Sequence, residues 1–139
     1  MIRLLFLLLI IAPPSADASE LPEITDILVG DLPAGWNITV VGAQGSETKG
    51  ELAFSINIAD QPFSVLGFAT WGDKVRLPKG VVLVDRGFDH SVYVLIEPTE
   101  TSFFLTLQGP KFSVVIRLSE SEPREAIRVV AALSRLEVN

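Results

Sequence analysis

The sequence contains no cysteine and a single histidine, His90, among its 139 residues. The absence of cysteine excludes disulfides, thiol catalysis and cysteine-based metal sites. Small exported domains often use disulfides to support a thin core, so this chain must fold by packing alone. The sequence also lacks a Gly-x-Ser-x-Gly turn, and only one histidine is present to act as a base for a serine nucleophile. We therefore predict no catalytic residue.

Positive charge is also scarce. The chain has 11 Lys and Arg against 17 Asp and Glu, which gives a formal net charge of −6 at pH 7. Duplex nucleic acid is bound by clustered Lys and Arg that neutralise its phosphates. A chain with this balance is not suited to that task, and we expect no nucleic acid partner.

One long apolar run is present, Leu4–Ala12, and it follows the positive charge of Arg3 at the N terminus. Two prolines end this run, and Ala16-Asp17-Ala18 then places small residues at the two positions that a signal peptidase reads. We predict a signal peptide over residues 1–18, cleaved before Ser19, and a periplasmic or secreted protein; an uncleaved anchor is the alternative. Crossing a bilayer core needs roughly 20 apolar residues, so we expect no transmembrane segment in the mature chain.

The residues after the signal peptide, 19–139, suit one globular domain built mostly from strands. Apolar residues alternate with polar or small ones at Leu52, Phe54, Ile56 and Ile58, which is the period of a half-buried strand. Residues 63–71 are apolar on both faces, so this strand should be central and covered on both sides. We expect strands at 37–41, 52–59, 63–71, 81–84, 92–96, 103–107 and 112–118, with a flexible loop at 42–50.

Two helices are predicted at the ends of this domain. Residues 21–30 have apolar side chains at helical spacing, and Gly30 can end a short helix there. A capping box at Ser119–Glu122 can start a second helix that continues to about Leu136. Apolar residues cover more than half of this second helix, whose arginines 124, 128 and 135 form one stripe.

The predicted fold class is therefore α+β, with an antiparallel meander of about seven strands and the C-terminal helix packed on one face. A small β-barrel or half-barrel closed by the helix is the alternative, because the doubly apolar strands at 63–71 and 103–107 could line a cavity. No motif assigns the chain to a family.

Asp85, Asp89 and His90 form a short polar cluster that resembles a cation site in composition. A zinc site normally needs three or four ligands, and calcium loops need several oxygens at regular offsets. The cluster has neither pattern. We interpret it as a hairpin turn and predict no metal site and no cofactor.

The two tryptophans, Trp36 and Trp71, lie at strand boundaries beside glycines, where a ring can be core, a plug at the sheet end, or an exposed contact. Core or plug is the favoured interpretation. If Trp71 is exposed, it shares a loop with Lys74, Arg76 and Lys79, and an aromatic beside cations is typical of a binding hot spot. Trp71, Lys74, Arg76 and Lys79 are therefore the candidate binding residues.

Size, export and the missing catalytic motifs favour a non-catalytic binding protein that recognises another macromolecule. Such a protein would act as an inhibitor, immunity or accessory factor of the cell envelope, with an envelope or secreted protein as its partner. The alternative is a carrier of a lipid or small apolar ligand, which the doubly apolar strands would allow. A small hydrolase is the third interpretation.

Overall fold

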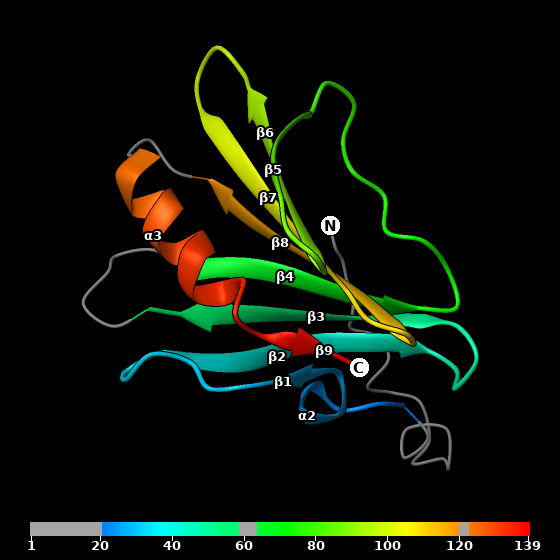
Figure 1. Ribbon diagram of the computed structural model, residues 1–139. Coiled ribbons are helices and arrows are strands. Elements are labelled where there is room, and N and C mark those ends of the chain that lie inside the picture. Colours follow the sequence, from blue (N-terminus) through cyan, green and yellow to red (C-terminus); the bar gives the residue numbers. More distant parts are fainter. Residues whose placement is uncertain (1–20, 59–63, 120–122) are drawn as a thin grey trace.

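The computed structural model describes residues 21–58, 64–119 and 123–139, and an antiparallel sheet forms its centre (Figure 1). The predicted signal peptide lies outside the described residues. Seven strands form this sheet in the order β2-β3-β4-β8-β7-β6-β5. Their bounds are β2 (Asn37–Gly45), β3 (Gly50–Asn57), β4 (Ser64–Trp71), β5 (Val82–Arg86), β6 (His90–Ile96), β7 (Thr101–Gln108) and β8 (Phe112–Ser119).

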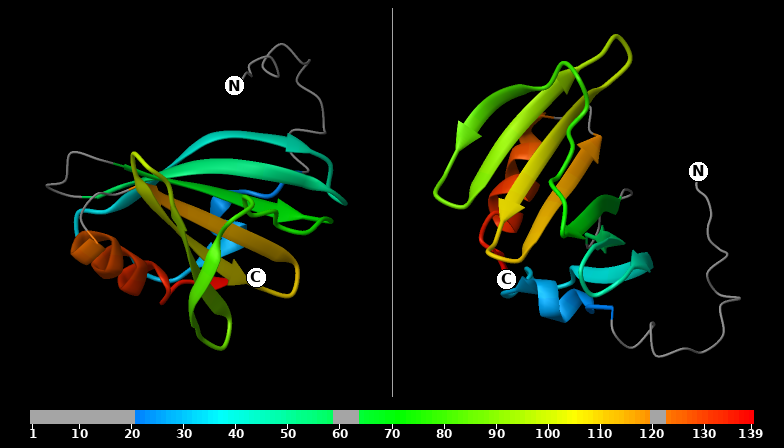
Figure 2. Two further views of the ribbon diagram at one scale, coloured as in Figure 1. Left: turned by 90° about the horizontal axis from the view of Figure 1, so that it is seen from above. Right: turned by 90° about the vertical axis from the view of Figure 1, so that its right-hand side faces the viewer.

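The sheet consists of two meanders, β2 to β4 and β5 to β8, which join where β4 pairs with β8. In this register Trp71 lies opposite Phe112, and Gly67 lies opposite Ile116. The sheet is not closed into a barrel, because β2 and β5 are its two edges. Twist turns β5, β6 and β7 steeply away from the direction of β2 and β3 (Figures 1 and 2). The predicted α+β class with a seven-stranded antiparallel sheet is confirmed.

Helix α3 (Pro123–Leu133) packs on one face of the sheet, as predicted (Figure 1). Its inward residues Ala126, Val129 and Leu133 are buried in the main core. Among the described residues, no helix is both long enough and apolar enough to cross a membrane. The predicted capping box falls partly outside the described residues, since residues 120–122 are not among them.

Both helices are shorter than predicted, because the chain ends form a small second sheet. Helix α2 is only Ile24–Ile27, and β1 (Leu28–Val29) follows it directly. Strand β1 pairs antiparallel with β9 (Glu137–Val138), which follows α3 after a short turn. The backbone N–H of Asn139 also donates to the carbonyl of Ile27 at 3.0 Å. At 28–29 these bonds between distant residues replace the predicted helical turn. At 134–136 the chain still turns locally, since the N–H of Leu136 donates to the carbonyl of Leu133 at 3.0 Å, before it enters β9.

The core lies between the sheet and the layer formed by α3, α2 and the small sheet. One row of the sheet shows its packing: Phe54 lies opposite Gly67, which lies opposite Ile116, which lies opposite Leu105. A Cβ atom at Gly67 would overlap the ring of Phe54, so the glycine leaves the space that this ring fills. Close packing of this kind is typical of protein interiors.

The opposite face of the sheet is only partly covered, and this corrects the prediction for residues 63–71. Strand β4 is central, between β3 and β8, as expected. On its outer face, however, Leu66 is 40% exposed and Phe68 is 37% exposed. The strand buried on both faces is β8, from Phe112 to Ile116. The alternation of apolar residues defines the two faces of a strand, but it does not show whether a second layer covers each of them.

Candidate functional site

A groove of about 710 Å³ lies on the sheet face opposite α3. The connection 72–81 runs from the end of β4 to β5 at the far edge of the sheet and forms one wall (Figure 1). The hairpin turn between β2 and β3 and the adjoining ends of these strands form the other wall. The groove is therefore built by segments that lie next to each other only in the folded chain.

The floor of the groove is formed by two strands and is mainly apolar. Phe68 of β4 and Val115 of β8 are register partners, and both line the groove. Thr70 lies two residues further along β4, on the same face, and its Oγ1 atom is buried without a hydrogen-bond partner among the described residues. This floor combines a small apolar surface with one polar atom.

The wall formed by the β2–β3 hairpin corrects the loop predicted at 42–50. Strand β2 continues to Gly45 and β3 begins at Gly50, so only residues 46–49 form the turn. Gly45 has a φ of 119°, which favours glycine, and the N–H of Ser46 donates to the carbonyl of Lys49 at 2.8 Å. The turn is thus a tight, hydrogen-bonded element rather than a flexible loop.

For one candidate binding residue, Trp71, the structure corrects the interpretation as an exposed contact. Its side chain is 2% exposed, and its ring contacts Phe112 edge to face at a centroid distance of 5.9 Å. Its Nε1–H donates to the carbonyl of Ser46 at 2.7 Å. Trp71 therefore belongs to the core and supports the hairpin turn from below, as the favoured interpretation predicted, and it is not an exposed contact. Trp36 is half-buried and packs against the same core.

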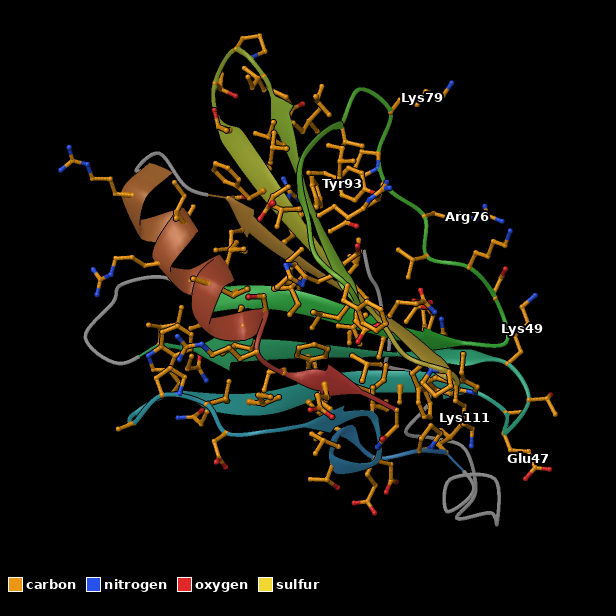
Figure 3. All side chains as sticks on the ribbon, in the orientation of Figure 1. Glu47, Lys49, Arg76, Lys79, Tyr93 and Lys111 are labelled. Carbon is orange, nitrogen blue, oxygen red and sulfur yellow. The ribbon has the colours of Figure 1, made fainter. Side chains whose placement is uncertain are left out.

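Lys74 and Arg76 both line the groove, as members of the predicted loop. Lys79 lies further along this connection and does not line it, and the neighbouring Gly80 is close to Leu95 of β6. Figure 3 shows the side chains of Lys49, Arg76 and Lys79 extending toward the same side of the molecule. Lys49 lines the groove as well, but no local pattern predicts this, because Lys49 belongs to the β2–β3 hairpin and not to the 72–81 connection.

The two carboxylates that line the groove already have partners. Asp73 accepts a hydrogen bond from the backbone N–H of Lys74 at 2.8 Å and lies 3.6 Å from the ammonium of Lys49. These two contacts, the first above all, and the more distant charge of Arg76 hold the pKa of the Asp73 carboxyl below its usual value. The carboxylate of Glu51 accepts from the side-chain amide of Gln44 at 3.0 Å.

The cations of the 72–81 connection are not paired in the same way. The ammonium of Lys74 and the guanidinium of Arg76 form no hydrogen bond or ion pair with another described residue. Arg76 is near enough to Asp73 to lower the pKa of its carboxyl, but neither Arg76 nor Lys74 makes a direct contact with a described carboxylate, and in this sense the two cations are uncommitted. They lie in a groove on a chain that is acidic as a whole. The surplus charge of the groove is positive and is suited to an anionic group.

The hairpin turn also contains a Ser-x-x-Lys sequence, Ser46 to Lys49, so the expectation that the chain has no such motif is wrong. In a serine–lysine pair the lysine amine lies within hydrogen-bond reach of the serine hydroxyl. Here the hydroxyl of Ser46 is 3.0 Å from that of Thr48, whereas the ammonium of Lys49 lies beside Asp73. These contacts stabilise a turn.

The Asp85–His90 cluster forms the turn between β5 and β6. The N–H of Gly87 donates to the carbonyl of His90 at 2.8 Å, and Asp85 accepts from the N–H of Arg86 at 2.9 Å. Within the described part of the chain, no group of three or more His, Asp or Glu side chains is placed to hold a metal ion. The cluster therefore has the hairpin geometry that its sequence suggested.

Comparison of the chain with protein-family models, with curated proteins and with solved structures finds no match. The groove and its charges are therefore the main structural guide to function.

Proposed function

We propose that this protein is a non-catalytic binding protein that recognises another macromolecule through the 72–81 connection and the groove beside it. The observation that supports this proposal is the pair of uncommitted cations, Lys74 and Arg76, beside the paired carboxylates of Glu51 and Asp73. An acidic surface on a partner would complement these cations. The roles that suit such a protein are those of an inhibitor, an immunity protein or an accessory factor.

Electrostatics would also orient such a partner. The chain carries a formal charge of −6, which repels an acidic partner as a whole, whereas Lys74 and Arg76 would attract it locally. Complementary charge of this kind mainly raises the association rate and the specificity of a complex. Recognition at the groove should therefore depend on salt concentration.

Replacing Lys74, Arg76 and Lys79 together by alanine should slow association with the partner and weaken its salt dependence. All three side chains are exposed, and exposed charges contribute only about 0–1 kcal/mol each to stability, so the fold should be kept. The matched control replaces Arg86, Arg124 and Arg135, which are equally exposed and remove the same charge elsewhere. A partner captured from a periplasmic extract is then measured by surface plasmon resonance at several salt concentrations.

The two variants make the result specific to the site. If the loop variant associates at the wild-type rate with the wild-type salt dependence, the 72–81 connection is not the contact surface. If both variants slow association equally, net charge alone steers the partner. A loss confined to the loop variant supports the proposal.

The apolar floor formed by Phe68 and Val115 supports a second proposal, a carrier of a lipid or small apolar ligand. A carrier should purify with its ligand, which mass spectrometry of an organic extract detects. A protein that binds macromolecules should give an extract without such a ligand.

We further propose that the protein acts outside the cytoplasm, in the periplasm or after secretion. The support is the order of Arg3, the apolar run and Ala16–Ala18 in the sequence. Protein recovered from its native host should begin at Ser19 or within one or two residues of it, as measured by intact mass and N-terminal sequencing. Recovery of the chain with residues 1–18 still attached would contradict export by cleavage.

A further inference from the structure

We propose that the ligand of the groove is an extended acidic peptide segment of the partner, in which an apolar side chain is adjacent to an aspartate or glutamate. The apolar side chain would pack on Phe68 and Val115, and the carboxylate would lie between Lys74 and Arg76. This inference rests on the proposed function and specifies the chemistry of the partner.

The groove has a size suited to a short segment rather than to a broad surface. Its volume of about 710 Å³ falls within the range of roughly 300–1,000 Å³ that is typical of sites for ligands of drug size. A few residues of an extended chain have a similar bulk. The two walls, the 72–81 connection and the β2–β3 hairpin, would hold such a segment from both sides.

The walls favour a peptide over an acyl chain. Gln44 and Glu51 of the hairpin wall line the groove, and Thr70 adds a polar group to the floor. An acyl chain would cover these polar groups without offering hydrogen bonds, and polar groups buried in this way are costly. A peptide carries its own N–H and C=O groups, which can pair with them.

The charged side chains of the groove favour an acidic segment and also restrict where its carboxylates can lie. Lys74 and Arg76 are uncommitted, and a guanidinium can bind a carboxylate through two parallel hydrogen bonds. Glu51 lies on the opposite wall and is already bound to Gln44, so a second carboxylate on that side would be repelled. The segment should therefore be acidic toward Lys74 and Arg76 of the 72–81 connection, where the carboxylate of Asp73 is paired with Lys49, and uncharged toward Glu51 of the hairpin.

Selection from a phage-displayed library of random dodecapeptides on the immobilised full chain tests this inference. The expected result is enrichment of an apolar residue next to aspartate or glutamate. The enriched peptide is then synthesised with a fluorescent label, beside a version in which the acidic residue becomes its amide. Fluorescence anisotropy should show at least tenfold weaker binding of the amide version.

Two matched pairs of variants locate the binding. Arg76→Ala should weaken binding of the labelled peptide at least tenfold, whereas Arg124→Ala on the far helix should change it less than twofold. Phe68→Ala should weaken it tenfold, whereas Leu66→Ala should not, because Leu66 is on the same face but does not line the groove. Circular dichroism confirms folding, and the amide NMR signals of Thr70 and Val115 in the unaltered protein report peptide contact without any substitution.

The inference is wrong if selection yields no acidic consensus, or if the amide version binds equally well. Vesicles of phosphatidylglycerol provide the second test. If the protein binds these vesicles and not the peptide, and if Arg76→Ala and Phe68→Ala weaken that binding, the ligand is a lipid and the inference is wrong. The proposed function is judged separately by the loop variant that lacks Lys74, Arg76 and Lys79. If that variant loses partner association while no peptide binds, the inference fails and the proposed function stands.

Discussion

Trp71→Ala should lower the free energy of unfolding by about 3–5 kcal/mol, the range expected when a buried aromatic side chain is removed from a core. Trp71 is 2% exposed and contacts Phe112 edge to face. The ring also packs on Gly50, where an added Cβ would lie 2.5 Å from it. Alanine would therefore leave a cavity where β3, β4 and β8 meet. Chemical denaturation measures the change, with far-UV circular dichroism as the signal because it does not depend on tryptophan fluorescence.

Trp71→Phe is the matched control, because it keeps a ring in the core but removes the Nε1–H that donates to the carbonyl of Ser46. The loss should be smaller than for alanine and should include about 0.5–1.5 kcal/mol for the hydrogen bond. The alternative role, an exposed anchor for a partner, makes the opposite forecast. It predicts wild-type stability with faster dissociation of the partner, and that result would contradict the burial of this ring.

Trp71 also shows why the site could be predicted only in part. Its burial depends on the β3–β4 register, which places Gly50 opposite it, and on the carbonyl of Ser46. Both partners are more than 20 residues away in sequence. Composition identified Lys74 and Arg76, because they are local to one loop. It could not identify Lys49, which reaches the groove through that same long-range register.

The strands themselves could be predicted from the sequence. Period-two alternation placed β3, and prolines and glycines marked most of the turns. The strand order could not be predicted, because the pairing of β4 with β8 joins Trp71 to Phe112 across the 72–81 connection and three hairpins. The ends of the helices were wrong for a similar reason. Leu28 and Val29 continue a helical pattern, but pairing with Val138 and Glu137 takes them into a strand.

The coverage of each sheet face was the least predictable feature. Phe68 on β4 and Val115 on β8 have similar apolar character and are register partners on the outer face. Val115 is buried, whereas Phe68 is 37% exposed. The 72–81 connection forms one wall of the groove beside both residues, and it has no periodic pattern that would predict its path. A segment without regular structure thus forms part of the groove, and strand alternation alone could not predict it.

Leu105→Ala or Ile116→Ala should each cost about 2–5 kcal/mol of stability, because both residues are fully buried and face each other across β7 and β8. His90→Ala should stay within about 0.5 kcal/mol, since His90 is partly exposed at the start of β6 and its backbone carbonyl makes the hydrogen bond of the turn. Urea denaturation of the three variants gives the comparison.

The two core variants also test whether the central row acts as one unit. Leu105 and Ile116 are in contact, so the double variant should differ from the sum of the single losses by about 0.5–3 kcal/mol. If the losses of stability are additive, the cavity left by one substitution does not affect the packing of the other residue across the β7–β8 pair. A loss at His90 as large as those in the core would contradict the turn interpretation of Asp85–His90 and would indicate a polar site at that hairpin.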